Sequence, residues 1–150
     1  MRSLRDEKCR DRLVERINNL SPGFQPTWGR MNVEQMLSHL VHAGELPFVA
    51  SVPERSSFIS RRVVKPLMLY LLPMPKEIKT SAEMDQQQKG RPPLGFEEDR
   101  RNLIESIEKL GTLPEGEECL AHPFFGKLSA KEWAIIGHKH IDHHLRQFGV

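Results

Sequence analysis

Apolar positions recur along most of the chain with the three-to-four-residue spacing of amphipathic helices. The first such segment, residues 4–20, is followed at 21–29 by prolines and glycines, which interrupt helices because proline lacks a backbone N–H group. Asn32 then has the character of an N-cap, and Gln35 completes a capping-box pattern. The pattern therefore predicts one helix within residues 4–20 and a second from residue 33 to about 45.

The middle of the chain is less regular. Residues 56–75 are interpreted as a helix that is interrupted or kinked at Pro66 and ended by Pro73 and Pro75. The polar segment 76–95 has little periodicity, and we expect a long surface loop that could cover a site.

Two further helices are predicted in the second half. Residues 96–111 are acidic in their first turn, and Gly111 serves as the C-cap. Ser129 and Glu132 repeat the capping-box pattern and begin a last helix that runs to about Phe148. Four main helices without repeats or strand-like alternation predict an all-α helical bundle, and 150 residues suit a single domain, residues 1–150.

Composition limits the classes of function. A hydrophobic fraction of 38% and a charged fraction of 28% are typical of a soluble globular protein, and a net charge of +2 gives no electrostatic case for nucleic acid. The longest apolar run, residues 63–75, is too short to cross a bilayer, and the charged N-terminal residues do not resemble a secretory signal. Cys9 and Cys119 are interpreted as reduced thiols. We therefore expect a cytoplasmic protein with neither nucleic acid nor membrane as a partner.

Four of the seven histidines lie in the last predicted helix, between His138 and His144. At about 100° per residue, His140 and His144 share the apolar face that should point into the bundle. His138 points nearly opposite, among charged residues, and His143 lies at the margin of the apolar face. The helix therefore predicts two inward imidazoles, one outward imidazole and one undecided.

Imidazoles four residues apart on a helix can reach one metal ion. The segment between His140 and His144 lacks the glutamate of a zinc-protease HExxH motif, so the spacing alone favours a pair of hydrogen-bonded core histidines over a metal site. A third ligand is available on the second helix, where His39 lies on the apolar face. His42 lies towards one side of that helix and is the alternative ligand. Bundles build metal sites from facing helices, although helical phase does not establish that these two helices are neighbours.

Two end segments carry a family resemblance. "WGRMNVEQMLSHLVHA" near the beginning and "HPFFGKLSAKEWAIIGHKHIDHHLRQFG" at the end resemble the DUF1569 branch of the DinB/YfiT-like superfamily. The resemblance implies a four-helix bundle, often dimeric, in which three histidines bind a divalent metal. It puts one ligand on His39 and two on His140 and His144, with Gln147 as the glutamine that commonly follows the last ligand.

The resemblance also implies a chemistry. Relatives in the superfamily include thiol-dependent S-transferases and isomerases that use low-molecular-weight thiols. A divalent metal (Zn, Ni or Fe) would lower the pKa of a coordinated thiol, while the same site could instead activate water for hydrolysis of a small-molecule substrate. A non-catalytic metal-binding bundle and a metal-free, pH-responsive histidine cluster are the alternatives. The sequence alone leaves open whether the protein is an enzyme.

Several other residues are candidates for the surroundings of the metal. Gln35, Gln147 and His143 could orient an imidazole or line a pocket. His122, in a loop shaped by proline and glycine, is interpreted first as structural and second as a pocket residue. The basic cluster of Arg61, Arg62 and Lys65 is interpreted as a solvated face, with attraction of an anionic thiol or carboxylate as the alternative.

Overall fold

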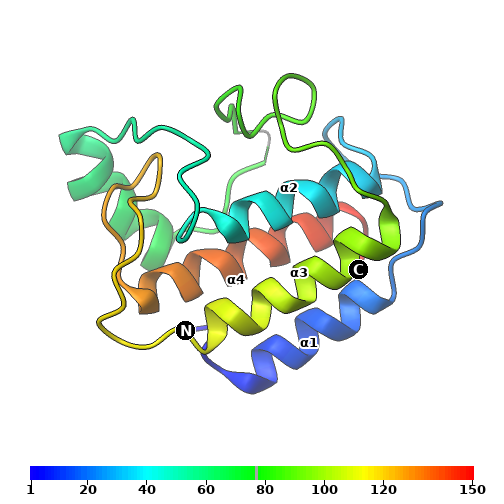
Figure 1. The fold of residues 1–150 in the computed structure, drawn as a ribbon, viewed down its shortest axis with the longest axis horizontal. Helices are drawn as coiled ribbons and strands as arrows, with labels where there is room; N and C mark the ends of the chain where they lie inside the picture. Colours follow the sequence, from blue (N-terminus) through cyan, green and yellow to red (C-terminus); the bar gives the residue numbers. More distant parts are fainter. Residues whose placement is uncertain (77) are drawn as a thin grey trace.

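The computed structural model describes residues 1–76 and 78–150, and its long elements are all helices (Figure 1). The elements in chain order are α1 (Glu7–Asn18), α2 (Val33–Glu45), η1 (Ser60–Val64), η2 (Leu67–Leu71), α3 (Phe96–Gly111) and α4 (Ala130–Gln147). Within the described residues there is no β-strand, only an isolated bridge between His122 and Gly126. The predicted all-α class is confirmed.

Both predicted capping boxes are present, and they begin the two helices that carry six of the seven histidines. The Asn32 side chain accepts from the Gln35 backbone at 2.8 Å, and the Gln35 side chain accepts from the Asn32 backbone at 3.0 Å. Ser129 and Glu132 form the same reciprocal pair at the start of α4. Because these pairs satisfy otherwise unbonded N–H groups, they fix where α2 and α4 begin. The positions of the histidines along the two helix axes follow from this.

The first helix is shorter than the apolar pattern predicted. Asp6 caps α1 by accepting from the Cys9 backbone, so the helix begins at Glu7. Leu4 lies outside the helix but is fully buried, and its N–H donates to the carbonyl of Ala134 on α4 at 3.1 Å. The periodicity of Leu4 therefore reflects burial in the core, not membership of the helix.

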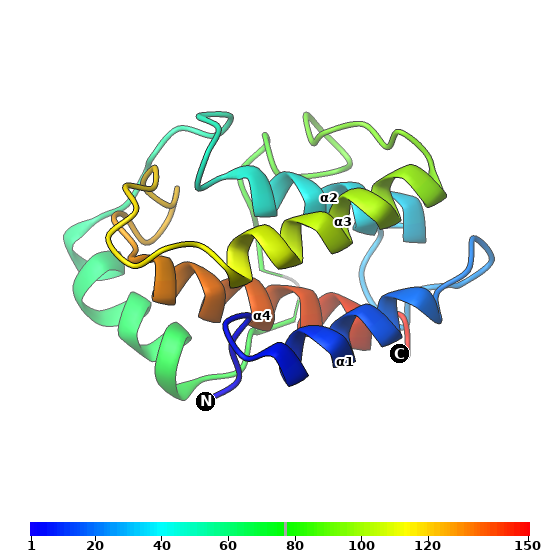
Figure 2. The same ribbon diagram turned by 60° about the horizontal axis from the view of Figure 1, so that its bottom comes forward.

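Helix α4 is the element around which the others are arranged, and it packs against α1, α2, α3 and η2 (Figure 2). The apolar faces of the four long helices meet in one core. At Gly44, α2 and α3 approach so closely that a Cβ atom would lie 2.0 Å from the Ser106 hydroxyl oxygen. The fully buried side chains of this core include Leu4, Ile17, Met36, Leu37, Ile107 and Leu145.

Residues 58–71, called the 58–71 helix below, form a continuous helical run that is wider than an α-helix. The Lys65 N–H donates to the Ser60 carbonyl and the Leu72 N–H to the Leu67 carbonyl, five residues back in each case. The predicted interruption at Pro66 is thus replaced by widened turns on either side of a residue that has no N–H to donate. Among the described residues, no helix combines the length and apolarity that crossing a bilayer requires.

The 58–71 helix is attached to α4 by a lysine. The Lys139 ammonium donates to the carbonyl of Met68 at 2.6 Å and to that of Leu72 at 2.7 Å. A cation at the C-terminus of a helix satisfies free carbonyls and complements the helix dipole. Met68 and Leu69 are buried in a second apolar cluster, which includes Trp133 and Ile136 of α4.

Candidate metal centre

Three imidazoles from two helices converge at the centre of the molecule. His39 is contributed by α2, and His140 and His144 are contributed by α4. The Nε2 atom of His140 lies 3.1 Å from Nε2 of His39 and 3.1 Å from Nε2 of His144. The ring centroids are 4.8 to 5.0 Å apart, and one ligand nitrogen from each ring lies within 4.8 Å of the other two. The structure therefore brings together the three residues that helical phase had placed on inward faces.

The ring of His39 is oriented by a backbone carbonyl. Its Nδ1 lies 3.1 Å from the carbonyl oxygen of Met84, which can only accept, so Nδ1 carries the proton and Nε2 presents a lone pair. The loop that carries Met84 is anchored to α3 near its C-terminal end, where the buried Asp99 carboxylate accepts from Arg91 at 2.7 Å and from the Leu94 backbone at 2.8 Å. The predicted covering loop thus contributes directly to the site.

The ring of His144 is oriented by a relay through Gln147. The Gln147 amide nitrogen donates to the carbonyl of Trp28 at 2.6 Å, which turns its Oε1 towards His144. Because Oε1 can only accept, His144 Nδ1 at 2.8 Å is the donor, and Nε2 again presents a lone pair. The resemblance had implied a role for Gln147, and the structure shows the contact that would give it one.

These two lone pairs face the same nitrogen of His140. If that nitrogen carries a proton, it can donate to only one neighbour, and the lone pair of the other neighbour is left without a donor; if it carries none, lone pairs face each other at both contacts. A shared cation satisfies all three nitrogens. Nitrogens bound at about 2.0–2.1 Å to one ion are separated by roughly 3 Å, as observed here. The donor set therefore fits a divalent metal.

Burial keeps the three rings in the form that binds metals. It lowers the pKa of His39 to about 4 and that of His144 to about 3, because a charged imidazolium loses its hydration in the core. Burial, reinforced by the neighbouring His144 and His39, holds the pKa of His140 well below its usual range. All three imidazoles are therefore neutral at pH 7, and the Nε2 atoms of His39 and His144 carry no proton that a metal would have to displace.

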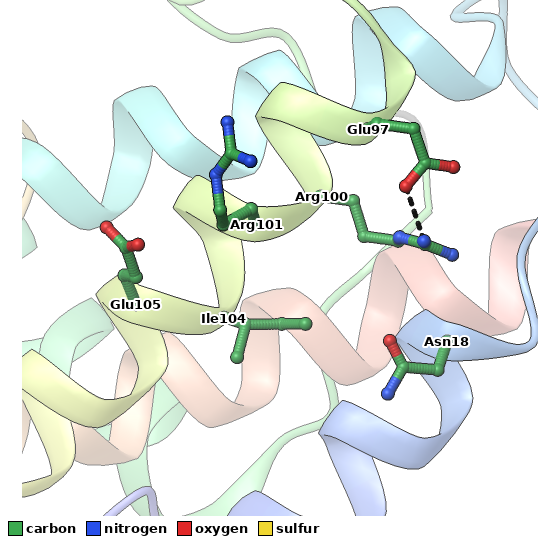
Figure 3. A pocket seen from close by; sticks show the side chains of 6 residues that line it. All are labelled: Asn18, Glu97, Arg100, Arg101, Ile104 and Glu105. Carbon is green, nitrogen blue, oxygen red and sulfur yellow. Dashed lines mark hydrogen bonds and ion pairs between the residues drawn. The ribbon is translucent and has the colours of Figure 1, made fainter.

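The site does not coincide with a surface hollow that residues of α1 and α3 line. That hollow has a volume of about 330 Å³ and lies between α1 and α3, away from α2 and α4 (Figure 3). Of the three converging rings, His39 and His144 are buried and His140 is half-buried. The ring of His140 therefore marks the more accessible side of the site. The hollow is lined by Asn18, Glu97, Arg100, Arg101, Ile104 and Glu105.

The alternative ligands do not reach the converging nitrogens. His42 points to Ser51, whose hydroxyl lies 2.9 Å from its Nε2, and its buried Nδ1 has no partner among the described residues. His143 is half-buried beside Trp28, with the ring centroids 5.9 Å apart, and a hydrogen bond with the backbone of Met74 partly offsets the burial that lowers its pKa. His42 lies in the core beside the site. His143 is half-buried, as its position at the margin of the apolar face of the helix predicted.

The two remaining candidates have structural contacts. The side-chain oxygen of Gln35 accepts from the backbone N–H of Asn32 and lies 3.4 Å from the side-chain amide nitrogen of Gln87. Neither contact involves an imidazole. His122 Nδ1 accepts from the backbone of Phe124 at 3.1 Å and of Phe125 at 3.2 Å, and its ring stacks on that of Phe125. These contacts favour the structural interpretation of His122.

The expectation that His138 points outward is wrong. Its side chain is only 5% exposed, because α1 covers the side of α4 that helical phase assigned to solvent. Arg16 of α1 reaches Asp142 of α4 at 2.6 Å on that side. A helix that is surrounded by other helices buries more than one face. A division of the helix into one apolar and one polar face does not predict this.

Comparison with known proteins places the chain in a family. The family described as "Protein of unknown function (DUF1569)" matches residues 2–149. The chain belongs to the DUF1569 family. No curated protein and no solved structure matches it. For this DUF1569 protein, chemistry must therefore be argued from the site itself.

Two parts of the DUF1569 site were not anticipated from the sequence. The backbone carbonyl of Met84 orients the ring of His39, and that of Trp28 orients the ring of His144 through Gln147. Every residue has a backbone carbonyl, so the sequence does not show which of them have this role. A third part, the close approach of the loop to Gln147, does have a sign in the sequence, namely the glycine that follows Trp28. Gly29 has a φ of +79°, and a Cβ atom there would lie 2.5 Å from the Gln147 amide nitrogen. Glycine is therefore required where the loop approaches Gln147.

Replacing Gly29 with alanine should disturb the site from outside. The new methyl group would displace Gln147 from Trp28 and release the proton-bearing nitrogen of His144. We expect metal affinity to fall by about tenfold, as is usual when a residue that orients a ligand is lost. Competition with a chromophoric chelator measures this. Gly23→Ala is the matched control, because a methyl group at Gly23 would meet nothing within 4 Å, and equal affinities in the two variants would refute the relay.

His122 should make the metal-free protein sensitive to acid. Burial lowers its pKa from 6.5 to about 4, so the unfolded chain takes up this proton at a higher pH than the folded protein. The stability contributed by neutral His122 is therefore complete above pH 6.5 and is lost as the pH falls towards 4. In His122→Asn, which keeps an acceptor for the loop, the uptake of protons on unfolding in this range should be smaller by about one. Denaturation at a series of pH values measures it, and an unchanged pH dependence would contradict the assignment.

Proposed function

We propose that this DUF1569 protein binds one divalent metal ion through His39, His140 and His144 and uses it as the centre of a thiol-transferase-like site. The observation that carries the proposal is the convergence of three neutral Nε2 atoms, two of them held in the lone-pair form by hydrogen bonds on Nδ1. Hydrogen bonding among core histidines would satisfy only one of the two lone pairs that face His140 Nε2.

We further propose that the fold is a four-helix bundle of the DinB/YfiT-like type, built from α1, α2, α3 and α4. The shared core of these helices supports this, as does the origin of the ligands in the second long helix and the last. The same resemblance makes a homodimer the expected assembly. Both cysteines are free thiols, which is compatible with the cytoplasmic location predicted from the sequence.

Three protein ligands leave coordination positions for a small molecule. When bound, the metal would lower the pKa of a coordinated low-molecular-weight thiol and so supply thiolate at neutral pH. The residues of the chain have three tasks: His39, His140 and His144 donate lone pairs, Met84 and Gln147 orient the rings, and the apolar surroundings exclude water. The S–H proton would pass to solvent on the accessible side of His140. The sulfur would then form a bond to the electrophilic atom of the substrate as the bond from that atom to its leaving group breaks, and the leaving group would depart with the electron pair.

Histidine substitutions should separate the ligands from their neighbours. We expect the purified wild-type protein to bind one divalent ion per chain, and His39→Ala, His140→Ala and His144→Ala each to lower the bound metal sharply, because two imidazoles hold an ion much less tightly than three. Elemental analysis and calorimetry measure this. His138→Ala is the control on the same helix, buried but outside the group, and it should keep its metal. Equal loss in all four variants would indicate general unfolding, and unchanged metal in the first three would remove the proposed site.

Thiol binding distinguishes a thiol-dependent site from the other metal functions. The cobalt-loaded protein should develop a sulfur-to-metal charge-transfer band when 2-mercaptoethanol is added, because a thiolate would occupy an open position on the metal. His144→Ala, with little metal, should not show the band. A cobalt-loaded wild type that shows no band at saturating thiol would exclude the thiol chemistry. The metal site itself would then stand, with water activation or a structural role as its function.

A further inference from the structure

The 58–71 helix lies at one end of the molecule (Figures 1 and 2). It exposes a row of large apolar side chains. Phe58, Ile59 and Leu71 are 70%, 65% and 74% exposed. Residues 59, 63, 67 and 71 recur every four positions, so in these wide turns they follow one side of the helix. We call the exposed row the apolar stripe, and it consists of Phe58, Ile59, Val63, Leu67, Tyr70 and Leu71.

The stripe is not a loosely attached segment. Met68 and Leu69, on the opposite side of the helix, are buried in the second apolar cluster, and Lys139 of α4 holds the carbonyls at the C-terminal end. The helix therefore buries one apolar face and displays another. Contiguous exposed apolar surface on a rigid element is the mark of a surface that contacts something else.

The charged residues beside the stripe indicate the kind of partner that the stripe contacts. The 58–71 helix contains Arg61, Arg62 and Lys65 and no acidic residue. Arg61 and Arg62 are exposed; Arg61 has only a distant, exposed pairing with Glu54 at 3.9 Å, and Arg62 forms no ion pair among the described residues. Lys65 is engaged, with Glu132 at 3.4 Å. Arg62 thus lies beside the stripe without an ion pair among the described residues, and Arg61 lies there with only a long, exposed one.

We propose that the apolar stripe docks the protein onto the surface of an anionic lipid bilayer. A helix that lies in the interface buries apolar side chains at the boundary of headgroups and acyl chains and sets arginines against lipid phosphates. This combination is present here. The expectation that a membrane is not a partner rested on the shortness of the apolar run, which bears on crossing a bilayer and not on lying along one.

A second copy of the chain fits the stripe less well. A symmetric contact through the stripe would bring Arg61 and Arg62 of one copy close to the same residues of the other, without acidic side chains on the helix to compensate. An anionic surface has the opposite charge to these residues. The proposal does not depend on the metal, because the stripe and the three converging imidazoles share no residue.

Vesicle binding by the full-length protein tests the proposal. The protein is sedimented with vesicles of phosphatidylcholine, and with vesicles of about three parts phosphatidylcholine to one part phosphatidylglycerol. We expect binding to the anionic vesicles only, weakening as salt is added. A wild-type protein that sediments with neither kind of vesicle overturns the proposal.

Two double variants assign the binding to the stripe. Ile59→Glu with Leu71→Glu should lower the vesicle-bound fraction by at least about tenfold, and Arg61→Gln with Arg62→Gln should remove the preference for anionic vesicles. Leu94→Glu is the control, because the Leu94 side chain is 55% exposed and lies outside the stripe, in the loop just before the N-cap of α3. All substituted side chains are exposed, and far-ultraviolet circular dichroism verifies that each variant is folded.

The remaining outcomes also decide. If the Ile59→Glu, Leu71→Glu variant binds anionic vesicles as well as the wild type, the stripe is not the docking surface. If sedimentation velocity shows a wild-type dimer that this variant converts to a monomer, and no vesicles are bound, the stripe is an interface between two copies and the lipid proposal fails. Metal content, measured in the same samples, shows whether the proposed metal function holds independently.

Discussion

The candidate site depends on two hydrogen bonds made by atoms that face away from it. Oxygen atoms of Met84 and Gln147 each accept a hydrogen bond from the Nδ1–H group of an imidazole, and this leaves the Nε2 lone pairs of His39 and His144 directed at a common point. Without those acceptors either tautomer would be available, and a ring in the wrong tautomer would present an N–H group to its neighbours. The rest of the structure can be understood as the support for these two acceptors. The loop that carries Met84 is held by Asp99, and Gln147 is held by the carbonyl of Trp28.

This support explains why segments far apart in the sequence are required together. His39 lies on the second long helix and the other two rings on the last, but the Met84 loop lies between η2 and α3, and Trp28 precedes α2. Four separate stretches of chain therefore set the orientation of three rings. Close packing makes such an arrangement stiff, because a displaced segment has little free volume in which to move.

Much of the fold follows from local sequence signals. The capping boxes at Asn32 and Ser129 located the starts of α2 and α4, and helical phase then placed His39, His140 and His144 on inward faces. What helical phase could not supply was the number of neighbours around α4, and for that reason the burial of His138 was missed. The widened turns around Pro66 were also missed, because the apolar spacing of residues 58–71 is compatible with more than one helix type. The orienting carbonyls carry no side-chain signature at all.

The three converging ligands are uncharged, and this has an electrostatic consequence for whatever binds beside them. Carboxylate or thiolate ligands would cancel part of the charge of a divalent cation, whereas imidazoles cancel none, and burial keeps these imidazoles neutral. A dication held here would keep its full double charge in surroundings that screen it poorly. Such a centre selects monoanions over neutral molecules of the same shape, so halide, azide and formate would compete for the open positions with any natural ligand.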